Sequence, residues 1–310
     1  MQNSSKKLRV IFVGMPDMAT VCLGALQKHF NICAVIPPPK FNPTSKSFCA
    51  FAKMLGLEVI EYDVTPNSPK IINKIKEKNA DIGVICSFDK LLNKDFLNTT
   101  KMGYINCHPS LLPHYRGANP YFHIINNGEK MSGITLHFAD ENFDTGEIIM
   151  QKGVILEERE TIGTLFNRCN YTIADMLIKV LSDIQNGAQI VTKKQPEGNF
   201  KTAPKIEGSI KIDLSKTGCE IERLTRAANP FYNAYIIFRG TELKILSVDY
   251  KKEAHNLEYG ITTKVDKNLL EITVQDGYIY PRTVQSGSWG IFQIADFISI
   301  FRPKQGERFL

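Results

Sequence analysis

The stretch YINCHPSLLPHYRG (residues 104–117) sets an amide and an imidazole two residues apart, at Asn106 and His108. An apolar run, residues 103–107, leads into the pair and indicates a β-strand, on which side chains two apart lie on one face. A preorganised asparagine N–H directed at a developing oxyanion contributes about 3–4 kcal/mol. A histidine can move a proton or, when charged, share that stabilisation. The pair therefore has the residue types that acyl transfer needs.

A second loop can supply a carboxylate to this pair. Residues 139–146 (ADENFDTG) follow a different predicted strand and contain Asp144. An aspartate beside an imidazole orients the ring and favours its charged form. No serine or cysteine nucleophile is evident, because the strand's period of two places Cys107 on the face opposite Asn106 and His108. The pattern favours direct attack by a substrate amine over a covalent intermediate.

Two other interpretations of these residues are weaker. The D-T-G at residues 144–146 matches that of aspartic proteases, but those enzymes need two such carboxylates and the chain has no second copy. His108 and His114 are separated by a proline-rich loop, and no cysteine or carboxylate joins them at metal-ligand spacing, so no metal site is expected. His137 falls on the polar face of its predicted strand, near the expected cleft, and its role stays open.

The Asn-x-His pair also has a plain structural explanation. Asn106 could bond to backbone at the end of the strand while His108 packs under the loop. The neighbouring residues count against this. Leu111 and Leu112 are too apolar for a solvent-facing loop without a function, and Arg116 adds a guanidinium group that can donate two parallel hydrogen bonds. We therefore expect a functional site here.

An alternation of apolar strands and amphipathic helices positions these residues. Such βαβα alternation predicts the α/β class, with a mostly parallel, doubly wound sheet. Ligands bind such sheets at the carboxyl ends of the strands, which is where Asn106 and His108 lie. The predicted strands are residues 8–15, 32–36, 57–62, 81–87, 103–107, 133–139 and 147–156, and the predicted helices are residues 18–30, 47–56, 70–78 and 162–185.

The composition changes after Gly187. The chain there becomes polar, rich in lysine and punctuated by proline and glycine, which is typical of an interdomain linker. One predicted helix, residues 219–229, then precedes several short alternating runs, which indicate a small antiparallel barrel or sandwich. We therefore expect a first domain at 1–187, a linker at 188–207 and a second domain at 208–310.

The composition bounds the class of protein. The 310 residues carry a formal charge of +6, with 43% hydrophobic residues, which is ordinary for a globular protein and permits a polyanionic partner such as tRNA without requiring one. Seven scattered cysteines indicate neither a disulfide framework nor a zinc site. No signal peptide or membrane span is recognisable, so a cytoplasmic location is expected. The chain lacks P-loop and dinucleotide-binding glycine motifs, which argues against a P-loop enzyme or a dehydrogenase.

The central motifs resemble those of the folate-dependent formyltransferases. INCHPSLLPHYRGANP (105–120) and GITLHFADENFDTGEI (133–148) are similar to that family's N-x-H-x-S-L-L-P-x-x-R-G motif and to its G-[IV]-T strand with an [LF]-D-T-G loop. VGMPDMA (13–19) resembles the MGTPDFA opening of the methionyl-tRNA formyltransferase family, and segments within 202–246 resemble its linker and the start of its C-terminal domain. The resemblance extends over nearly the whole chain. It implies a Rossmann-like, mostly parallel sheet followed by a small OB-like β-barrel.

The resemblance implies that Asn106, His108 and Asp144 form a catalytic triad and that 10-formyltetrahydrofolate is the formyl donor. A substrate amine would attack the formyl carbon, Asn106 and protonated His108 would stabilise the oxyanion, and Asp144 would hold His108. Contacts to the donor are implied at Phe88, Leu91, Leu92, Ser110, Leu111, Asp140 and Asn142. Contacts to the acceptor are expected at Pro16, Arg116, Arg223, Arg226 and Lys244. No metal is expected.

The expected acceptor is the amino group of initiator methionyl-tRNA, with the enzyme acting as a monomer and with no membrane partner. The alternative is a sugar N-formyltransferase, which acts on a nucleotide-linked amino sugar. Residues 37–47 (PPPKFNPTSKS) are shorter and less basic than the loop that the tRNA enzymes place against the acceptor stem. Leu136-His137 and residues 116–124 (RGANPYFHI) also lean towards the sugar enzymes. The near-complete match of the C-terminal part favours methionyl-tRNA.

Two further alternatives concern the whole protein, one with the same triad and one without catalysis. A hydrolase that deformylates the folate is one of them. A catalytically silent binding protein is the other, and it would be expected to have lost triad residues, whereas all three are present. Formyl transfer is therefore the favoured interpretation.

Overall fold

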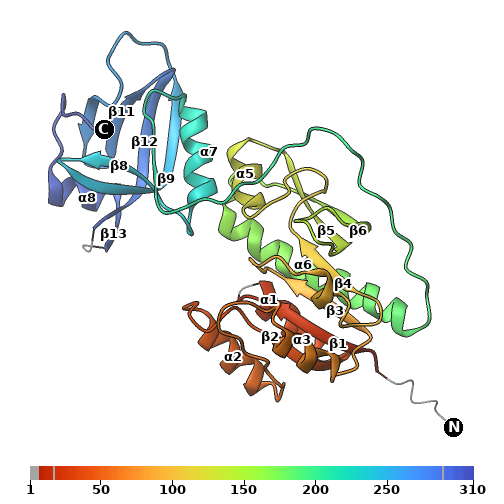
Figure 1. Cartoon of the computed structure of the whole chain (residues 1–310). Coiled ribbons are helices and arrows are strands. Elements are labelled where there is room, and N and C mark those ends of the chain that lie inside the picture. Colours follow the sequence, from red (N-terminus) through yellow and green to blue (C-terminus); the bar gives the residue numbers. More distant parts are fainter. Residues whose placement is uncertain (1–6, 17, 288–289) are drawn as a thin grey trace. The chain divides into compact units, whose positions relative to one another are not determined.

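The chain forms two compact units (Figure 1), and the computed structural model describes residues 7–16, 18–287 and 290–310. Residues 121–130 and 156–166 group with the C-terminal part of the chain rather than with the residues around them. Asp17, which immediately precedes the helix predicted at residues 18–30, lies outside the described residues. The first unit consists of Met1–Pro120, Met131–Ile155 and Asn167–Pro204, and the second of Tyr121–Lys130, Leu156–Phe166 and Lys205–Leu310.

A six-stranded sheet in the order β2-β1-β3-β4-β5-β6 forms the centre of the first unit. Strands β1 to β4 run parallel, β5 is antiparallel to β4, and β6 is antiparallel to β5. This arrangement confirms the predicted mostly parallel, Rossmann-like sheet. The strands are β1 (Arg9–Gly14), β2 (Asn31–Ile36), β3 (Ile82–Cys86), β4 (Tyr104–His108), β5 (Met131–Phe138) and β6 (Ile148–Ile155).

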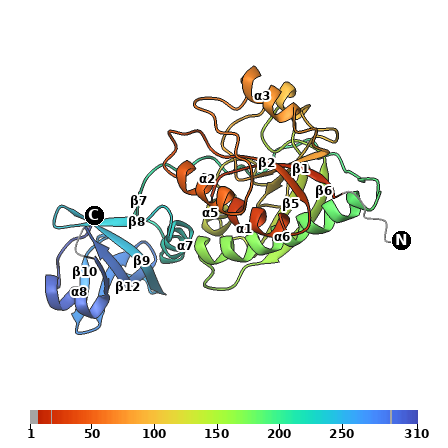
Figure 2. The ribbon, with the colours of Figure 1, turned by 90° about the horizontal axis from the view of Figure 1, so that it is seen from below.

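Helices cover both faces of this sheet: Figure 2 shows α3 on one side and α1 and α6 on the other. Ile71 and Ile75 of α3 are one helical turn apart, so both point at the sheet, where they share a buried cluster with Ile11 and Val13 of β1. Burial on both faces explains the near-continuous apolar runs of the parallel strands. The helices before residue 188 are α1 (Met18–Leu26), α2 (Ser45–Met54), α3 (Pro69–Lys76), α4 (Lys94–Leu97), α5 (Pro120–Asn126) and α6 (Ile162–Gln185). Nearly all of α5 and the first residues of α6 belong to the second unit.

The prediction of a strand at residues 57–62 was wrong. This segment forms only an isolated β-bridge between Val35 and Val59. The N–H of Val35 donates to Glu58 and the carbonyl of Val35 accepts from Ile60. Ile60 and Tyr62 then pack into the same apolar cluster as α3. Packing at the edge of the sheet therefore accounts for the alternating pattern without a ladder of hydrogen bonds.

The second unit has a mostly antiparallel sheet in the order β10-β11-β12-β9-β8-β7, with β13 paired to β12. This separate antiparallel sheet agrees with the predicted small barrel-like domain. Helix α7 matches the predicted helix and begins with a capping box between Thr217 and Glu220. The elements are β7 (Ile210–Lys211), α7 (Gly218–Ala228), β8 (Ala234–Phe238), β9 (Thr241–Lys252), β10 (Thr262–Asp266), β11 (Leu269–Val274), β12 (Gly277–Ser286), β13 (Gly290–Gln293) and α8 (Ile294–Phe301).

Residues 188–204, most of the predicted linker, are hydrogen-bonded into the first unit. Lys193 pairs with Ile148 of β6 through two backbone hydrogen bonds of 2.8 Å. Arg116 forms a parallel bridge with Thr202, and the N–H of Ala203 donates to the carbonyl of Arg116 at 2.8 Å. This segment is therefore fixed beside the loop that follows β4.

Candidate active site

Strands β4 and β5 place three polar side chains on one face of the sheet. Asn106 and His108 are two apart on β4, and His137 of β5 is directly opposite Asn106 in the antiparallel register. Side chains of opposed residues in an antiparallel pair lie on the same face. Cys107 faces the other way, with its Sγ 3.7 Å from Sγ of Cys86 on β3.

The carboxylate of Asp144 completes the cluster. Its Oδ1 lies 3.3 Å from Nδ1 of His108 and 3.2 Å from Nδ2 of Asn106. Its Oδ2 accepts the backbone N–H of Gly117 at 3.0 Å. Asp144 has a φ of 58°, a left-handed conformation that aspartate tolerates better than most residues. The structure thus brings together the three residues predicted as a triad.

Burial and charge act in opposite directions on Asp144. Its burial would raise the pKa of the carboxyl group, but the attraction of His108 and hydrogen bonds from His108 and Gly117 outweigh that effect. The pKa of Asp144 is therefore held well below its usual range. The carboxylate stays ionised at neutral pH and provides a fixed negative charge beside the imidazole of His108.

The loop after β4 fixes the ring of His108. Its Nε2 lies 2.8 Å from the carbonyl oxygen of Tyr115. A carbonyl can only accept, so Nε2 carries a proton. Nδ1 faces Asp144, and a proton there completes an ion pair between the two buried groups.

His137, whose role the sequence left open, belongs to this cluster. Its Nε2 lies 3.0 Å from Nδ2 of Asn106 and 3.7 Å from Oδ1 of Asp144. Its position on the polar face of a predicted strand was the available signal. The sequence alone did not reveal the pairing register of β4 with β5, which places His137 opposite Asn106.

Gln195 is a second residue that sequence reasoning missed. Its Nε2 donates to the backbone carbonyls of Asp144 at 2.9 Å and Gly146 at 2.8 Å. Its Oε1 accepts from Nε and Nη2 of Arg116, at 3.2 and 2.5 Å. Arg116 is therefore held against the Asp144 loop by Gln195. No periodic pattern marks Gln195, because it lies in a polar segment that reads as linker.

The residues predicted to contact the donor lie in three segments of the first unit. Ser110 is fully buried, and its hydroxyl donates to the carbonyl of His114 at 2.7 Å. Leu111 is half-buried and packs so closely on Gly133 that a Cβ there would lie 2.4 Å from the leucine side chain. The carboxylate of Asp140 accepts the hydroxyl of Thr145 at 2.7 Å.

The other predicted donor contacts differ in exposure. Leu92 is buried and Phe88 packs against the same apolar cluster, whereas Leu91 is 43% exposed. Asn142 is exposed, and its backbone N–H donates to Asp140 at 3.1 Å. Side chains able to line a binding surface therefore come from the segments after β3 and β5.

The predicted acceptor contacts lie in both units. Pro16 lies two residues after the end of β1 in the first unit, and Lys244 is a half-buried residue of β9 in the second. Arg226 forms a two-pronged ion pair with Glu222, at 2.5 and 2.9 Å, and donates to the carbonyl of Glu160 at 2.8 Å. Arg223 of the same helix has a buried Nε without a hydrogen-bond partner among the described residues. Arg226 is thus occupied by contacts within its unit.

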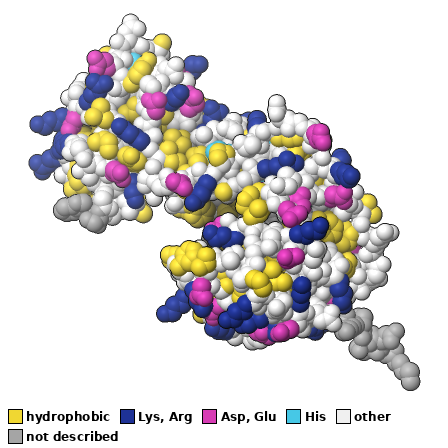
Figure 3. All heavy atoms as spheres, viewed as in Figure 1, with side chains coloured by type: hydrophobic (Ala, Val, Ile, Leu, Met, Phe, Trp, Pro, Cys, Tyr) yellow, Lys and Arg dark blue, Asp and Glu magenta, His cyan; other side chains and the backbone are white. Residues whose placement is uncertain are grey.

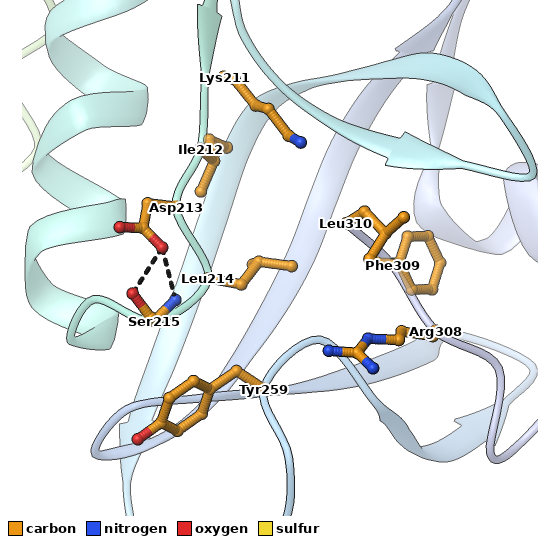
Figure 4. Close-up of a pocket in the computed structure, with 9 residues that line it drawn as sticks. All are labelled: Lys211, Ile212, Asp213, Leu214, Ser215, Tyr259, Arg308, Phe309 and Leu310. Atoms are coloured by element: carbon orange, nitrogen blue, oxygen red, sulfur yellow. Dashed lines mark hydrogen bonds between the residues drawn. The ribbon is translucent and has the colours of Figure 1, made fainter.

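A hollow of about 390 Å³ in the second unit is a different feature (Figure 4). It is lined by residues 211–215 and 308–310 together with Tyr259, and the carboxylate of Asp213 accepts both the backbone N–H and the hydroxyl of Ser215. None of the predicted site residues lines it. Within the described ranges, no group of three metal-ligating side chains could hold an ion, and no helix is long and apolar enough to cross a membrane.

Two family models match the chain. The one described as "Formyl transferase" matches residues 35–181, and the one described as "Formyl transferase, C-terminal domain" matches residues 207–302. The sheet of the first unit and its Asn106-His108-Asp144 cluster fall within the first match, so fold and site together define a formyltransferase.

Relatives in sequence narrow the class. A methionyl-tRNA formyltransferase of Lachnospira eligens is 31% identical over 291 residues, which cover 90% of this chain and 92% of that protein. Another, of Caldicellulosiruptor saccharolyticus, is 30% identical over 311 residues, which cover 96% and 98%. The chain belongs to the methionyl-tRNA formyltransferase family.

Solved structures share the fold. The sugar 3N-formyltransferase WlaRD, crystallised with dTDP and 5-N-formyl-THF, has a TM-score of 0.67 at 24% identity, covering 91% of this chain and 98% of that one. An N-formyltransferase from Helicobacter canadensis, in complex with folinic acid and dTDP-3-aminofucose, has a TM-score of 0.67 at 23% identity, covering 90% and 100%.

Proposed function

We propose that the protein transfers the formyl group of 10-formyltetrahydrofolate to the free amino group of methionyl-tRNA. The observation that carries the proposal is the contact of one ionised carboxylate, Asp144, with both an amide donor, Asn106, and an imidazole, His108. The family membership and the curated relatives named methionyl-tRNA formyltransferase support the same reaction. The function would be exercised by a monomer in the cytoplasm, during initiation of protein synthesis.

The reaction is a direct acyl transfer in two steps. The amine nitrogen attacks the formyl carbon, a C–N bond forms, and the carbonyl electron pair moves to the oxygen. Asn106 donates to that oxyanion and the positive charge of His108 stabilises it. The carbonyl then reforms, the bond to N10 of the folate breaks, the amine loses one proton and N10 gains one.

The role of Asp144 follows from its charge. A carboxylate whose pKa is held well below the usual range is a weak proton acceptor. We therefore assign Asp144 an electrostatic and orienting role toward His108, rather than that of the principal base. The polar pair Asn106 and His108 then acts directly on the developing oxyanion.

The folate would bind beside the triad. The residues proposed to contact it include apolar side chains that could pack against a flat ring, such as Leu91, and a carboxylate, Asp140, that could accept hydrogen bonds. The predicted catalytic domain, residues 1–187, would function together with the segment 188–204 that is bonded to it, and the predicted domain 208–310 would contact tRNA. The proposed donor contacts are Phe88, Leu91, Leu92, Ser110, Leu111, Asp140 and Asn142.

One observation favours the second candidate function, formylation of a nucleotide-linked amino sugar. The loop at 37–47 has only two lysines, and Lys40 is paired with Asp63 at 3.0 Å. On the face shown in Figure 3, lysines and arginines are interspersed with acidic residues in both units. The match to the curated methionyl-tRNA formyltransferases over both units keeps tRNA as the first candidate.

Incubation with 10-formyltetrahydrofolate and either methionyl-tRNA or a panel of nucleotide-linked amino sugars distinguishes the two candidates. We expect formylmethionyl-tRNA, detected after deacylation by mass spectrometry. Turnover of a sugar without formylation of the tRNA would replace the first candidate by the second. Release of formate without any formylated acceptor would instead identify a hydrolase.

A further inference from the structure

We propose that His137 is a positioning residue for formyl transfer, which holds the amide of Asn106 in the orientation that presents an N–H to the oxyanion. The proposal rests on the proposed function and assigns a role to a buried histidine of β5. His137 is 1% exposed and lies directly opposite Asn106 in the β4–β5 register.

The hydrogen bonds of His137 define its tautomer. Nδ1 lies 2.8 Å from the carbonyl oxygen of Phe138, which can only accept, so Nδ1 carries a proton. In the neutral ring Nε2 is then a bare acceptor. The nearest donor to it is Nδ2 of Asn106, at 3.0 Å. The Phe138 carbonyl therefore sets the ring so that it accepts from Asn106.

The orientation of the Asn106 amide follows from its two neighbours. Nδ2 has two hydrogens, one directed at Nε2 of His137 and the other at Oδ1 of Asp144, 3.2 Å away. A flipped amide would set its oxygen against a carboxylate oxygen and a ring lone pair. The positions of the nitrogen and oxygen of an amide are assigned from such hydrogen-bond networks. Here His137 and Asp144 both favour the orientation in which Nδ2 faces them.

The two neighbours of Asn106 have different roles in the reaction. The N–H that faces Asp144 points toward the charged side of the cluster, which also contains His108. During transfer the formyl oxygen accepts this N–H, while the bond to His137 is retained and keeps the amide from rotating. Replacing His137 should therefore lower the rate of the chemical step more than the affinity for the folate donor.

Two substitutions separate positioning from packing. His137→Leu removes the acceptor, and His137→Gln keeps an amide oxygen at about the reach of Nε2. We expect kcat to fall about 10- to 100-fold in His137→Leu, less than loss of the whole oxyanion donor, with KM for the donor changed less than about threefold. His137→Gln should recover a substantial part of the loss.

The decisive comparison is made in a second background. With Asn106→Ala already present, His137→Leu should have no further effect on kcat, because the group it positions is gone. Equal losses in both backgrounds, or a His137→Gln no better than His137→Leu, would overturn the proposal. These kinetics are measured with whichever acceptor the wild-type enzyme formylates. An error in the proposed acceptor would therefore not change the test of the role of His137.

A spectroscopic measurement tests the geometry without any acceptor. Nitrogen NMR of protein labelled with ¹⁵N-histidine should show His137 with Nδ1 protonated and Nε2 bare at neutral pH, assigned by its loss in His137→Gln. In uniformly ¹⁵N-labelled protein, the side-chain NH2 signals of Asn106 should shift in the same variant. A proton on Nε2 would contradict the hydrogen bond on which the proposal stands.

Discussion

Oδ1 of Asp144 lies 3.3 Å from Nδ1 of His108, and both side chains are buried. The same oxygen is 3.2 Å from Nδ2 of Asn106. One carboxylate oxygen thus orients both groups that act on the oxyanion. Because both contacts depend on one negative charge, the charge of Asp144 is the first property to test.

Asp144→Asn keeps the shape of the side chain and removes its charge. We expect kcat to fall about 10²- to 10⁴-fold, because His108 loses the partner that favours its charged form. Initial rates of formyl transfer measure this, with circular dichroism as the check on folding. Glu158→Gln, an exposed position, is the matched control for loss of one charge. A rate within a few-fold of wild type would remove Asp144 from the mechanism.

The depressed pKa of Asp144 also predicts how stability depends on pH. A carboxylate with a lower pKa in the folded state stabilises the fold fully above its unfolded pKa, about 3.9, and that contribution is lost as the pH falls toward the folded pKa. The difference in unfolding free energy between wild type and Asp144→Asn should therefore be constant between about pH 5 and about pH 7, and shrink below about pH 4. Denaturant unfolding at several pH values measures it, and a constant difference down to about pH 3 would contradict the prediction.

Gln195 should matter through the carbonyls that it binds. Gln195→Glu keeps an acceptor for Arg116 but sets a carboxylate oxygen against the carbonyls of Asp144 and Gly146. We expect it to lower kcat more than Gln195→Ala, which should itself cost about 1–3 kcal/mol of stability for the unpaired carbonyls. Steady-state rates and thermal unfolding measure both effects, and Gln275→Ala at an exposed position is the control. Equal activity of the two Gln195 variants would exclude this role.

Two glycines give opposite predictions for the same substitution. A Cβ at Gly146 would lie 1.8 Å from the carbonyl oxygen of Phe138, so Gly146→Ala must displace the loop that contains Asp144 and should cost about 1–3 kcal/mol or more, together with activity. At Gly24 in α1 the nearest atom would be 3.7 Å away, so Gly24→Ala should stabilise the fold by about 0.5–1 kcal/mol. Thermal unfolding measures both, and a Gly146→Ala protein as stable and active as wild type would contradict the close approach.

The sequence predicted the parts of the site that depend on local periodicity. Alternation of strands and helices predicted the sheet, and a period of two predicted that Asn106 and His108 share a face. Pairing between strands is not local, so the register that sets His137 opposite Asn106 could not be read from the chain. Gln195 was missed for a related reason, since its partners are far from it in sequence and its own segment has no regular pattern.

The backbone pairing of residues 188–204 has a practical consequence for dividing the chain. A shortened protein that ends at residue 187 would lose Gln195 and the strand-like pairing of Lys193 with Ile148, and with them the support of the Asp144 backbone. One that ends at Pro204 would keep both. The smallest piece able to keep its catalytic loop in place therefore extends well past the last helix of the sheet, to the end of a segment that has no secondary structure of its own.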